Sequence, residues 1–237
     1  AGSSHIMCFG VPLRNRVSLV PLNDADGRFL CLNGPFPQGP TYWRKVERLA
    51  QSHKVFIYWQ GSQHMEEHLF ASTPPFDFML SGEPDLPIAA DAVIVPEQMI
   101  REKFARSFEK LAAVLTRLGD RGNQGVYVCG TPPPKGDTAA IRAALARERY
   151  WMQRLALLGS DPLAVPLTAP ETLYKMWSVM QSMLRDVAHR HGAEFLPIPT
   201  EAQTPEGFLR EEFWCRDVTH ANENLGPLIL RSLRPCL

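Results

Sequence analysis

Two apolar runs, KVFIYW at residues 54–59 and GVYVCG at residues 125–130, determine the fold class of this chain. Each run has the length of a strand and few polar residues, which is typical of a strand buried on both faces. Longer stretches with apolar residues three or four positions apart separate and follow these runs, and they predict helices. Strands that alternate with helices favour parallel pairing, so we expect an α/β fold with a central, mostly parallel sheet covered by helices on both faces.

The remaining elements are expected around these two runs, within a single domain that spans residues 1–237. Further strands are predicted at residues 17–20, 29–32 and 194–198, and helices at residues 41–51, 96–119, 137–158, 168–192 and 225–233. Thr168 begins a capping-box pattern, and Gly192 is typical of a helix end. Residues 72–91 carry four prolines, which predict a long loop with a short structured piece at 76–80.

Composition and charge exclude several classes of protein. The 237 residues include 25 Lys and Arg against 25 Asp and Glu, so the formal net charge is zero and the pI is near 7.2. Proteins that bind nucleic acid or anionic membranes usually carry a basic excess, so we expect neither partner. No apolar stretch reaches the ~20 residues of a membrane span, and no secretory leader pattern opens the chain. Five scattered cysteines without a CxxC pair indicate reduced thiols, and we expect a cytoplasmic location.

One pair of residues near the end of the chain carries the strongest chemical signal. Asp217 and His220 are three positions apart, between the last predicted strand and the terminal helix, where open α/β sheets place their sites. A carboxylate beside an imidazole fixes its tautomer and raises its basicity, as a general base requires. The pair needs a nucleophile, and Ser4 in the glycine-led stretch GSSH at residues 2–5 offers a hydroxyl that a histidine can activate.

Acyl transfer also requires hydrogen-bond donors for the oxyanion. The main-chain N–H of Gly34 and the side-chain amide of Gln63 each follow an apolar run and are the candidates, with Gly39 as an alternative to Gly34. His64 follows Gln63 directly, so it is a candidate for contact with the substrate.

Taken in order, these motifs resemble the sequence blocks of the SGNH/GDSL hydrolases, a family of esterases, lipases and carbohydrate O-acyl esterases or transferases. The Gly-Asp-Ser block of the family corresponds to residues 2–4, and its second block to Gly34. The Gly-x-Asn-Asp block corresponds to GSQH at residues 61–64, and the Asp-x-x-His block to DVTH at residues 217–220. The resemblance implies a flavodoxin-like three-layer α/β sandwich.

The resemblance also implies a function and roles for the site residues. It implies a serine esterase or O-acyl(acetyl)transferase in which Ser4 attacks the ester, His220 takes its proton and Asp217 orients His220. The N–H groups of Ser4 and Gly34, with the amide of Gln63, are then the oxyanion donors. No metal and no organic cofactor is implied, and the partner is a small-molecule or glycan ester.

The chain departs from the family pattern at three places. Ser3 stands where the family has an aspartate, and Gln63 stands where it has an asparagine. The first strand of the family ends at its Gly-Asp-Ser block, whereas only Ala1 precedes Gly2 in this sequence.

Other interpretations of the same residues stay open. The stretch at residues 2–5 also occurs in expression-tag leaders, and the fold could serve as a non-catalytic binding or assembly module. The stretch HMEEH at residues 64–68 fits an inverted zinc-peptidase pattern, with His64 and His68 as ligands and Glu67 as base. Glu148 is then the candidate third ligand. The arginines at positions 142, 147, 149 and 154 predict a solvated helix face, or a contact with a phosphate or sugar acid.

Overall fold

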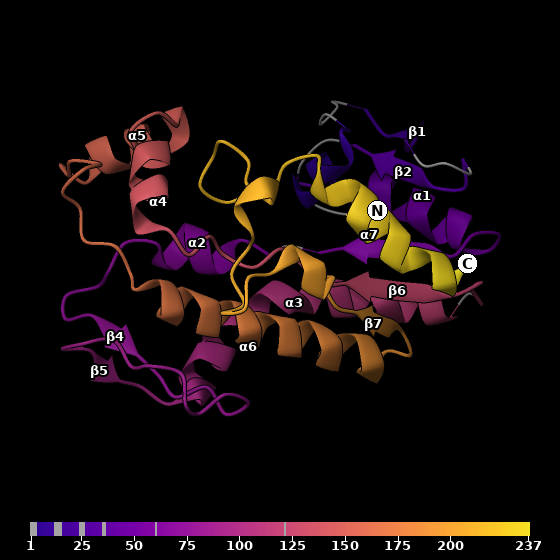
Figure 1. Ribbon diagram of the computed structural model, residues 1–237. Helices are drawn as coiled ribbons and strands as arrows, with labels where there is room; N and C mark the ends of the chain where they lie inside the picture. The colour runs from indigo at the N-terminus through magenta and orange to yellow at the C-terminus, as the bar shows by residue number, and fades with distance from the viewer. Residues whose placement is uncertain (1–3, 12–15, 24–26, 35–36, 60, 121) are drawn as a thin grey trace.

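A three-stranded parallel sheet in the order β3–β6–β7 forms the centre of the molecule (Figure 1). Its strands are β3 (Val55–Tyr58), β6 (Val126–Cys129) and β7 (Glu194–Leu196). This computed structural model describes residues 4–11, 16–23, 27–34, 37–59, 61–120 and 122–237, and of residues 4–6 the main chain alone. All pairs in the sheet are parallel, so the predicted α/β class is confirmed.

Side chains alternate between the two faces of this sheet and so divide the core in two. Val55 and Ile57 belong to the apolar cluster on one face, whereas Tyr58 belongs to the cluster on the other. The first face is covered by α1 (Pro40–Ala50), α3 (Glu97–Asp120) and α6 (Pro170–Arg190). The second face is covered by α7 (Leu225–Leu233) and the short 3-10 helix η1 (Ser4–Phe9). Helices therefore cover both faces, as predicted from the alternation of elements.

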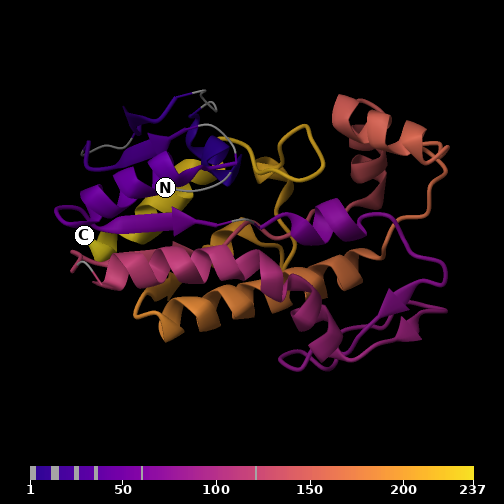
Figure 2. The same cartoon turned by 180° about the vertical axis from the view of Figure 1, so that it is seen from behind.

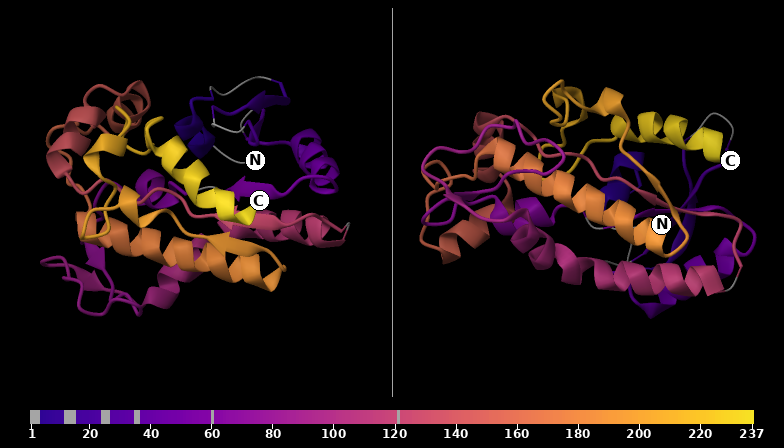
Figure 3. Two further views of the ribbon diagram at one scale, coloured as in Figure 1. Left: turned by 45° about the vertical axis from the view of Figure 1, so that its right-hand side comes forward. Right: turned by 90° about the horizontal axis from the view of Figure 1, so that it is seen from below.

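The two longest helices, α3 and α6, lie side by side along the first face (Figure 3). Leu111 of α3 and Met176 of α6 are completely buried there, which explains the three-and-four spacing of apolar residues in both stretches. Gly192 follows α6 with a φ of +69°, as the helix-end prediction requires. The capping-box prediction is wrong, because Ala169 is the residue that caps α6. The Thr168 hydroxyl instead donates to the carbonyl oxygen of His68, a tertiary contact.

Two smaller strand pairs lie outside the parallel sheet (Figures 1 and 2). The strands predicted at 17–20 and 29–32 form an antiparallel pair of their own, β1 (Ser18–Pro21) with β2 (Leu30–Asn33). Alternate residues of β1 are exposed, as expected for a strand in a sheet with one solvent-exposed face and not for a strand of the buried central sheet. Within the proline-rich loop, the predicted short piece is β4 (Phe76–Asp77), which pairs with β5 (Val93–Ile94).

The helix predicted at residues 137–158 is two helices, α4 (Thr138–Leu145) and α5 (Arg149–Leu157), which project from one end of the molecule (Figure 1). Asp137 caps α4 by accepting from the N–H groups of Ala139 and Ala140. The chain breaks at Glu148, whose carboxylate accepts a hydrogen bond from a distant loop. Sequence periodicity could not reveal this tertiary contact. No helix of the described chain is long and apolar enough to cross a membrane.

Candidate functional site

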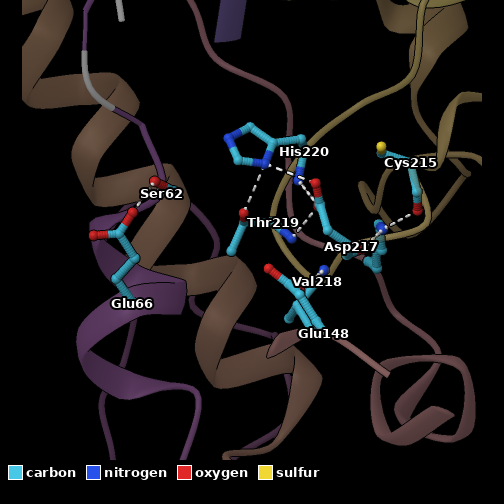
Figure 4. A network of polar contacts seen from close by, with 9 residues as sticks. Ser62, Glu66, Glu148, Cys215, Asp217, Val218, Thr219 and His220 are labelled. Atoms are coloured by element: carbon cyan, nitrogen blue, oxygen red, sulfur yellow. Dashed lines mark hydrogen bonds and ion pairs between the residues drawn. The ribbon is translucent and has the colours of Figure 1, made fainter. Parts of the chain in front are cut away.

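The Asp217-Val218-Thr219-His220 turn forms a carboxylate–imidazole pair (Figure 4). His220 Nδ1 lies 2.9 Å from Asp217 Oδ2, and both side chains are 23% exposed. Asp217 Oδ1 also accepts from the main-chain N–H groups of Thr219, at 2.9 Å, and His220, at 2.7 Å. An ionised carboxylate only accepts hydrogen bonds, so Nδ1 carries the hydrogen and the lone pair lies on Nε2. This is the tautomer that a general base needs.

Electrostatics of the turn keep Asp217 ionised and make His220 more basic. Burial alone would raise the pKa of the Asp217 carboxyl, but the hydrogen bonds and charge of His220 and the N–H of Thr219 hold it well below its usual range. Burial alone would lower the pKa of His220, but the hydrogen bond and charge of Asp217, with the charges of Glu148 and Glu66, raise it above its usual value. A carboxylate on α2 (Gln63–His68) therefore acts on the imidazole.

Two charged residues from neighbouring segments hold the turn in place. Lys135, in the loop after β6, is 5% exposed and donates to the carbonyl oxygens of Cys215, at 2.7 Å, and Asp217. Burial lowers its pKa, although the charges of Asp217 and Glu148 oppose the shift. Glu148 Oε2 accepts from the N–H of Val218 at 3.2 Å. Burial raises the pKa of Glu148, and the charge of Asp217 adds to the shift. The turn is thus positioned between an ammonium and a carboxylate.

Ser62 lies where the chain leaves the central sheet and enters α2, at the carboxyl end of β3. Gly61 makes this path possible, because a Cβ atom there would lie 2.3 Å from the Thr131 side chain. Thr131 follows β6 and is itself held by Gln181, whose amide nitrogen donates to Thr131 Oγ1 at 2.9 Å. The loop that carries Ser62 therefore packs directly against the end of the neighbouring strand.

The Ser62 hydroxyl does not cap α2, although serine at this position usually does. It donates instead to Glu66 Oε1 at 2.9 Å. In Figure 4 the His220 imidazole lies between Asp217 on one side and Ser62 with Glu66 on the other. The Glu66 charge also raises the pKa of His220, so the start of α2 lies within electrostatic range of the Asp217–His220 turn.

The predicted nucleophile Ser4 is the first residue of η1, and its side chain lies outside the described residues, as do Gly2 and Ser3. Its role stays a prediction. The predicted oxyanion donor Gly34 follows β2, and its N–H donates to Asn33 Oδ1 at 2.7 Å. That N–H is already engaged, and the oxyanion role of Gly34 also stays a prediction.

Gln63 and His64 begin α2 with their side chains directed inward. Gln63 is 9% exposed and His64 is 2% exposed. Burial, together with the charge of His68, lowers the pKa of His64 to about 3, so the imidazole is neutral at physiological pH. Neither ring nitrogen of His64 has a hydrogen-bond partner in the described part of the chain. The predicted contacts of Gln63 with an oxyanion and of His64 with the substrate stay predictions.

The zinc-peptidase arrangement is not assembled around HMEEH. No group of three His, Cys, Asp or Glu side chains in the described chain is placed to hold a metal ion. Glu67 is half exposed and lies 3.7 Å from Lys103, while His68 packs edge-on against Phe76 and Phe104. The carboxylate of Glu148, the expected third ligand, accepts a hydrogen bond from the main-chain N–H of Val218.

Two of the four helical arginines bind main-chain carbonyl oxygens. Arg142 donates to the carbonyl oxygens of Leu163 and Val165, and Arg147 to that of Ala143. These contacts agree with a solvated face better than with a phosphate site.

Comparison with known proteins assigns no family: no family model, no curated protein and no solved structure matches this chain. The function must therefore be argued from the site itself.

Sequence reasoning missed the contacts of Lys135 and Glu148 with the turn, and it did not single out Ser62. Ser62 carried a usable signal, because it lies three positions after Trp59, where a buried strand run without glycine ends. Lys135 and Glu148 carried none, because their contacts join segments about 80 and 70 positions apart in the chain.

Proposed function

We propose that this protein is a serine-dependent carboxylic ester hydrolase or O-acyltransferase in which Ser62 is the nucleophile, His220 the general base and Asp217 the residue that orients His220. One observation carries the proposal. His220 Nδ1 lies 2.9 Å from Asp217 Oδ2, and the charge of Glu66, which accepts from the Ser62 hydroxyl, acts on the imidazole; in the view of Figure 4, Ser62 and Glu66 lie on the side of the ring away from Asp217. An imidazole that a carboxylate orients, beside a serine at the carboxyl end of a parallel strand, is an arrangement that can activate the serine.

The reaction follows from these atoms. Ser62 Oγ attacks the acyl carbonyl carbon while its proton passes to His220 Nε2, and His220 then returns that proton to the departing alkoxide. The acyl group stays on Ser62 Oγ until water, or an acceptor hydroxyl, attacks it and gives its own proton to Nε2. That proton finally returns to Ser62 Oγ as the acid or the new ester leaves. In the resting structure Ser62 donates to Glu66, so rotation about its χ1 angle precedes attack.

The main-chain N–H of Ser62 and the N–H groups that begin α2 are the oxyanion donors in this proposal. N–H groups in the first turn of a helix have no partner within the helix, and they face developing negative charge favourably. Small-molecule or glycan esters are the substrate class we propose, since the site needs no cofactor for this chemistry.

The topology supports the flavodoxin-like sandwich of the SGNH/GDSL family as the parent fold. The parallel strand β3 precedes Ser62, and β6 is its neighbour in the sheet. The Asp-x-x-His turn lies between the last strand and the terminal helix. With Ser62 as nucleophile, β3 supplies the strand that the family has before its serine. The short three-stranded sheet is smaller than that fold requires, so this part of the proposal rests on connectivity.

The test compares Ser62→Ala with Ser4→Ala, and Ser72→Ala serves as a matched control at an exposed serine outside the site. We measure hydrolysis of p-nitrophenyl acetate and labelling by a fluorophosphonate probe, with the labelled peptide identified by mass spectrometry. Ser62→Ala should lose activity by about 10³-fold or more, and the label should lie on Ser62. Ser4→Ala and Ser72→Ala should keep the wild-type rate.

A label on Ser4, with full activity in Ser62→Ala, would transfer the nucleophile to η1 and refute the assignment of Ser62. No label and no hydrolysis in correctly folded wild-type protein would refute the enzymatic proposal and favour the non-catalytic module.

A further inference from the structure

An apolar cavity of about 370 Å³ lies beside β3, between the β1–β2 hairpin, α1 and α7. The hairpin, α1 and β3 follow one another in the sequence, whereas α7, which completes the wall, comes from the end of the given chain. Side chains that line it include Phe29, Leu32, Val46, Phe56, Leu230 and Leu233. Small-molecule sites usually have volumes of about 300–1,000 Å³, so this cavity is large enough for a ligand.

The interior of the cavity matches a flexible hydrocarbon. Leu32 and Val46 are almost fully buried, and the rings of Phe29 and Phe56 lie 6.1 Å apart at a tilt. An alkyl chain gains about 0.8 kcal/mol for each methylene that it buries in such surroundings. Leu30 lines the cavity while remaining 45% exposed, which places it at the opening to solvent.

Basic residues stand at one end of the same cavity. Arg28, His53 and Lys54 belong to its lining, and the described residues around it include no Asp or Glu side chain. Arg28 and His53 are exposed. Lys54 Nζ donates to the main-chain oxygens of Cys236, at 2.6 Å, and Leu237, at 3.0 Å, which use two of its three hydrogens. An apolar interior with a basic rim is complementary to a molecule with a hydrocarbon tail and an anionic head.

The cavity is separate from the proposed catalytic site. Its basic end is formed by residues that precede β3, whereas Ser62 follows the opposite, carboxyl end of that strand. Neither Ser62 nor His220 lines the cavity. A ligand held here therefore does not occupy the position of the ester in the proposed reaction.

We propose that this cavity binds a fatty acid, with the alkyl chain among the leucines and phenylalanines and the carboxylate at Arg28, His53 and Lys54. The carboxylate is complementary in charge to the basic rim, and the chain fills the apolar interior. The proposal does not depend on the proposed ester chemistry, and we test it in the Ser62→Ala background so that catalysis cannot influence the result.

The first experiment is a calorimetric titration with octanoate, decanoate, dodecanoate and tetradecanoate, each below its micellar concentration. The Kd should fall about fourfold with each added methylene until the chain fills the cavity, and then level off. Dodecanol and dodecyltrimethylammonium are the matched ligands without the negative charge. Both should bind more weakly than dodecanoate, and the ammonium compound most weakly.

The second experiment uses two variants at exposed positions, where replacement leaves the core intact. Leu30→Trp should obstruct the opening and weaken dodecanoate binding at least about tenfold, and Leu158→Trp, at an exposed leucine after α5, is its control. Arg28→Glu should weaken binding roughly three- to tenfold. Arg48→Glu is the matched control, because Arg48 is exposed on α1 and does not line the cavity.

Three results would overturn the proposal: no saturable binding of any fatty acid by folded protein, a Kd independent of chain length, or equal binding of dodecanoate and dodecyltrimethylammonium. Loss of binding in the control variants to the same degree as in Leu30→Trp and Arg28→Glu would also refute this location. A failed Ser62 assignment leaves all of these outcomes unchanged, so the two proposals fail independently.

Discussion

Two pairs of a carboxylate with a basic side chain have similar distances in very different surroundings. Lys175 Nζ lies 3.1 and 3.0 Å from the two oxygens of Asp77, and both side chains are 0% exposed. His220 Nδ1 lies 2.9 Å from Asp217 Oδ2, and both side chains are 23% exposed. The first pair joins α6 to the β4–β5 region, and the second lies in a turn before α7.

The difference lies in burial and in the complete use of hydrogen-bonding capacity by the buried pair. Lys175 also donates to the carbonyl oxygen of Pro87 at 2.8 Å, so all three of its hydrogens have acceptors. Asp77 also accepts from the N–H groups of Phe78 and Ala89, both at 2.8 Å. The Asp217–His220 pair is partly open to solvent. A saturated buried pair holds elements together, whereas a partly exposed pair lies within reach of a molecule that comes from solvent.

The largest effect that would sharpen this comparison is expected for Asp217→Asn. The amide can present a donor to Nδ1, which places the imidazole hydrogen on Nε2 and removes the base. We expect kcat for p-nitrophenyl acetate to fall by about 10⁴-fold. The thermal midpoint should stay near that of the wild type, because the amide oxygen still accepts from the turn's N–H groups.

Asp186→Asn is the control for that change, since Asp186 is 58% exposed on α6 and far from the turn in sequence. A kcat of Asp217→Asn within tenfold of the control would contradict the role of Asp217.

The next largest effect concerns stability and the buried pair. Lys175→Met leaves a buried carboxylate without its cation, and the free energy of unfolding should fall by about 3–5 kcal/mol. For a chain of this length, that lowers the thermal midpoint by roughly 6–20 °C. Adding Asp77→Asn removes the uncompensated charge and should recover part of the loss. Calorimetry or denaturant titration measures both changes.

A matched surface pair supplies the control for the buried one. Arg210→Met breaks an exposed ion pair with Glu212 at 3.0 Å and should change the free energy of unfolding by less than about 1 kcal/mol. Equal effects of Arg210→Met and Lys175→Met would break the distinction between saturated and exposed pairs.

The smallest effect is a displacement of the pH–rate profile. His220 acts as a base only when neutral, and its pKa is raised, so activity should fall as pH decreases through a midpoint above the ordinary value of ~6.5. Glu148→Gln removes one of the charges that raise this pKa, while its amide oxygen can still accept from Val218. The acid limb should move to lower pH with the plateau rate preserved.

Glu67→Gln is the control for Glu148→Gln, because Glu67 is half exposed and paired with Lys103. A shift of the acid limb to higher pH in Glu148→Gln, or an equal shift in Glu67→Gln, would contradict the electrostatic account of His220.

Local patterns predicted most of the secondary structure. The runs at 54–59 and 125–130 are central parallel strands, and the terminal helix occupies residues 225–233 as expected. The errors occur where a distant contact decides the outcome. The predicted helix at 137–158 is divided just before α5, at Glu148, which accepts from the Val218 N–H, and Thr168 bonds to His68 in place of capping α6.

The same distinction between local and distant contacts applies to the candidate site. Asp217 and His220 are close in sequence, and their spacing was enough to predict that they form a pair. The segment that brings Glu66 near the imidazole was not predictable in this way, because it lies more than 150 positions earlier and the order of the strands places it there. Block order assigned Gln63 of this segment to oxyanion binding and Ser4 to the nucleophile, and both assignments stay predictions.

By itself, then, the sequence determined the fold class, the buried strands and the Asp217–His220 pair, because each depends on the spacing of residues within short segments of the chain. Only the tertiary structure decided which segments converge on that pair: Lys135 and Glu148 beside the turn, and the start of α2 opposite the imidazole. It also decided the saturation of Asp77–Lys175 and the cavity beside β3. Convergence depends on packing between distant segments, and local spacing carries no information about it.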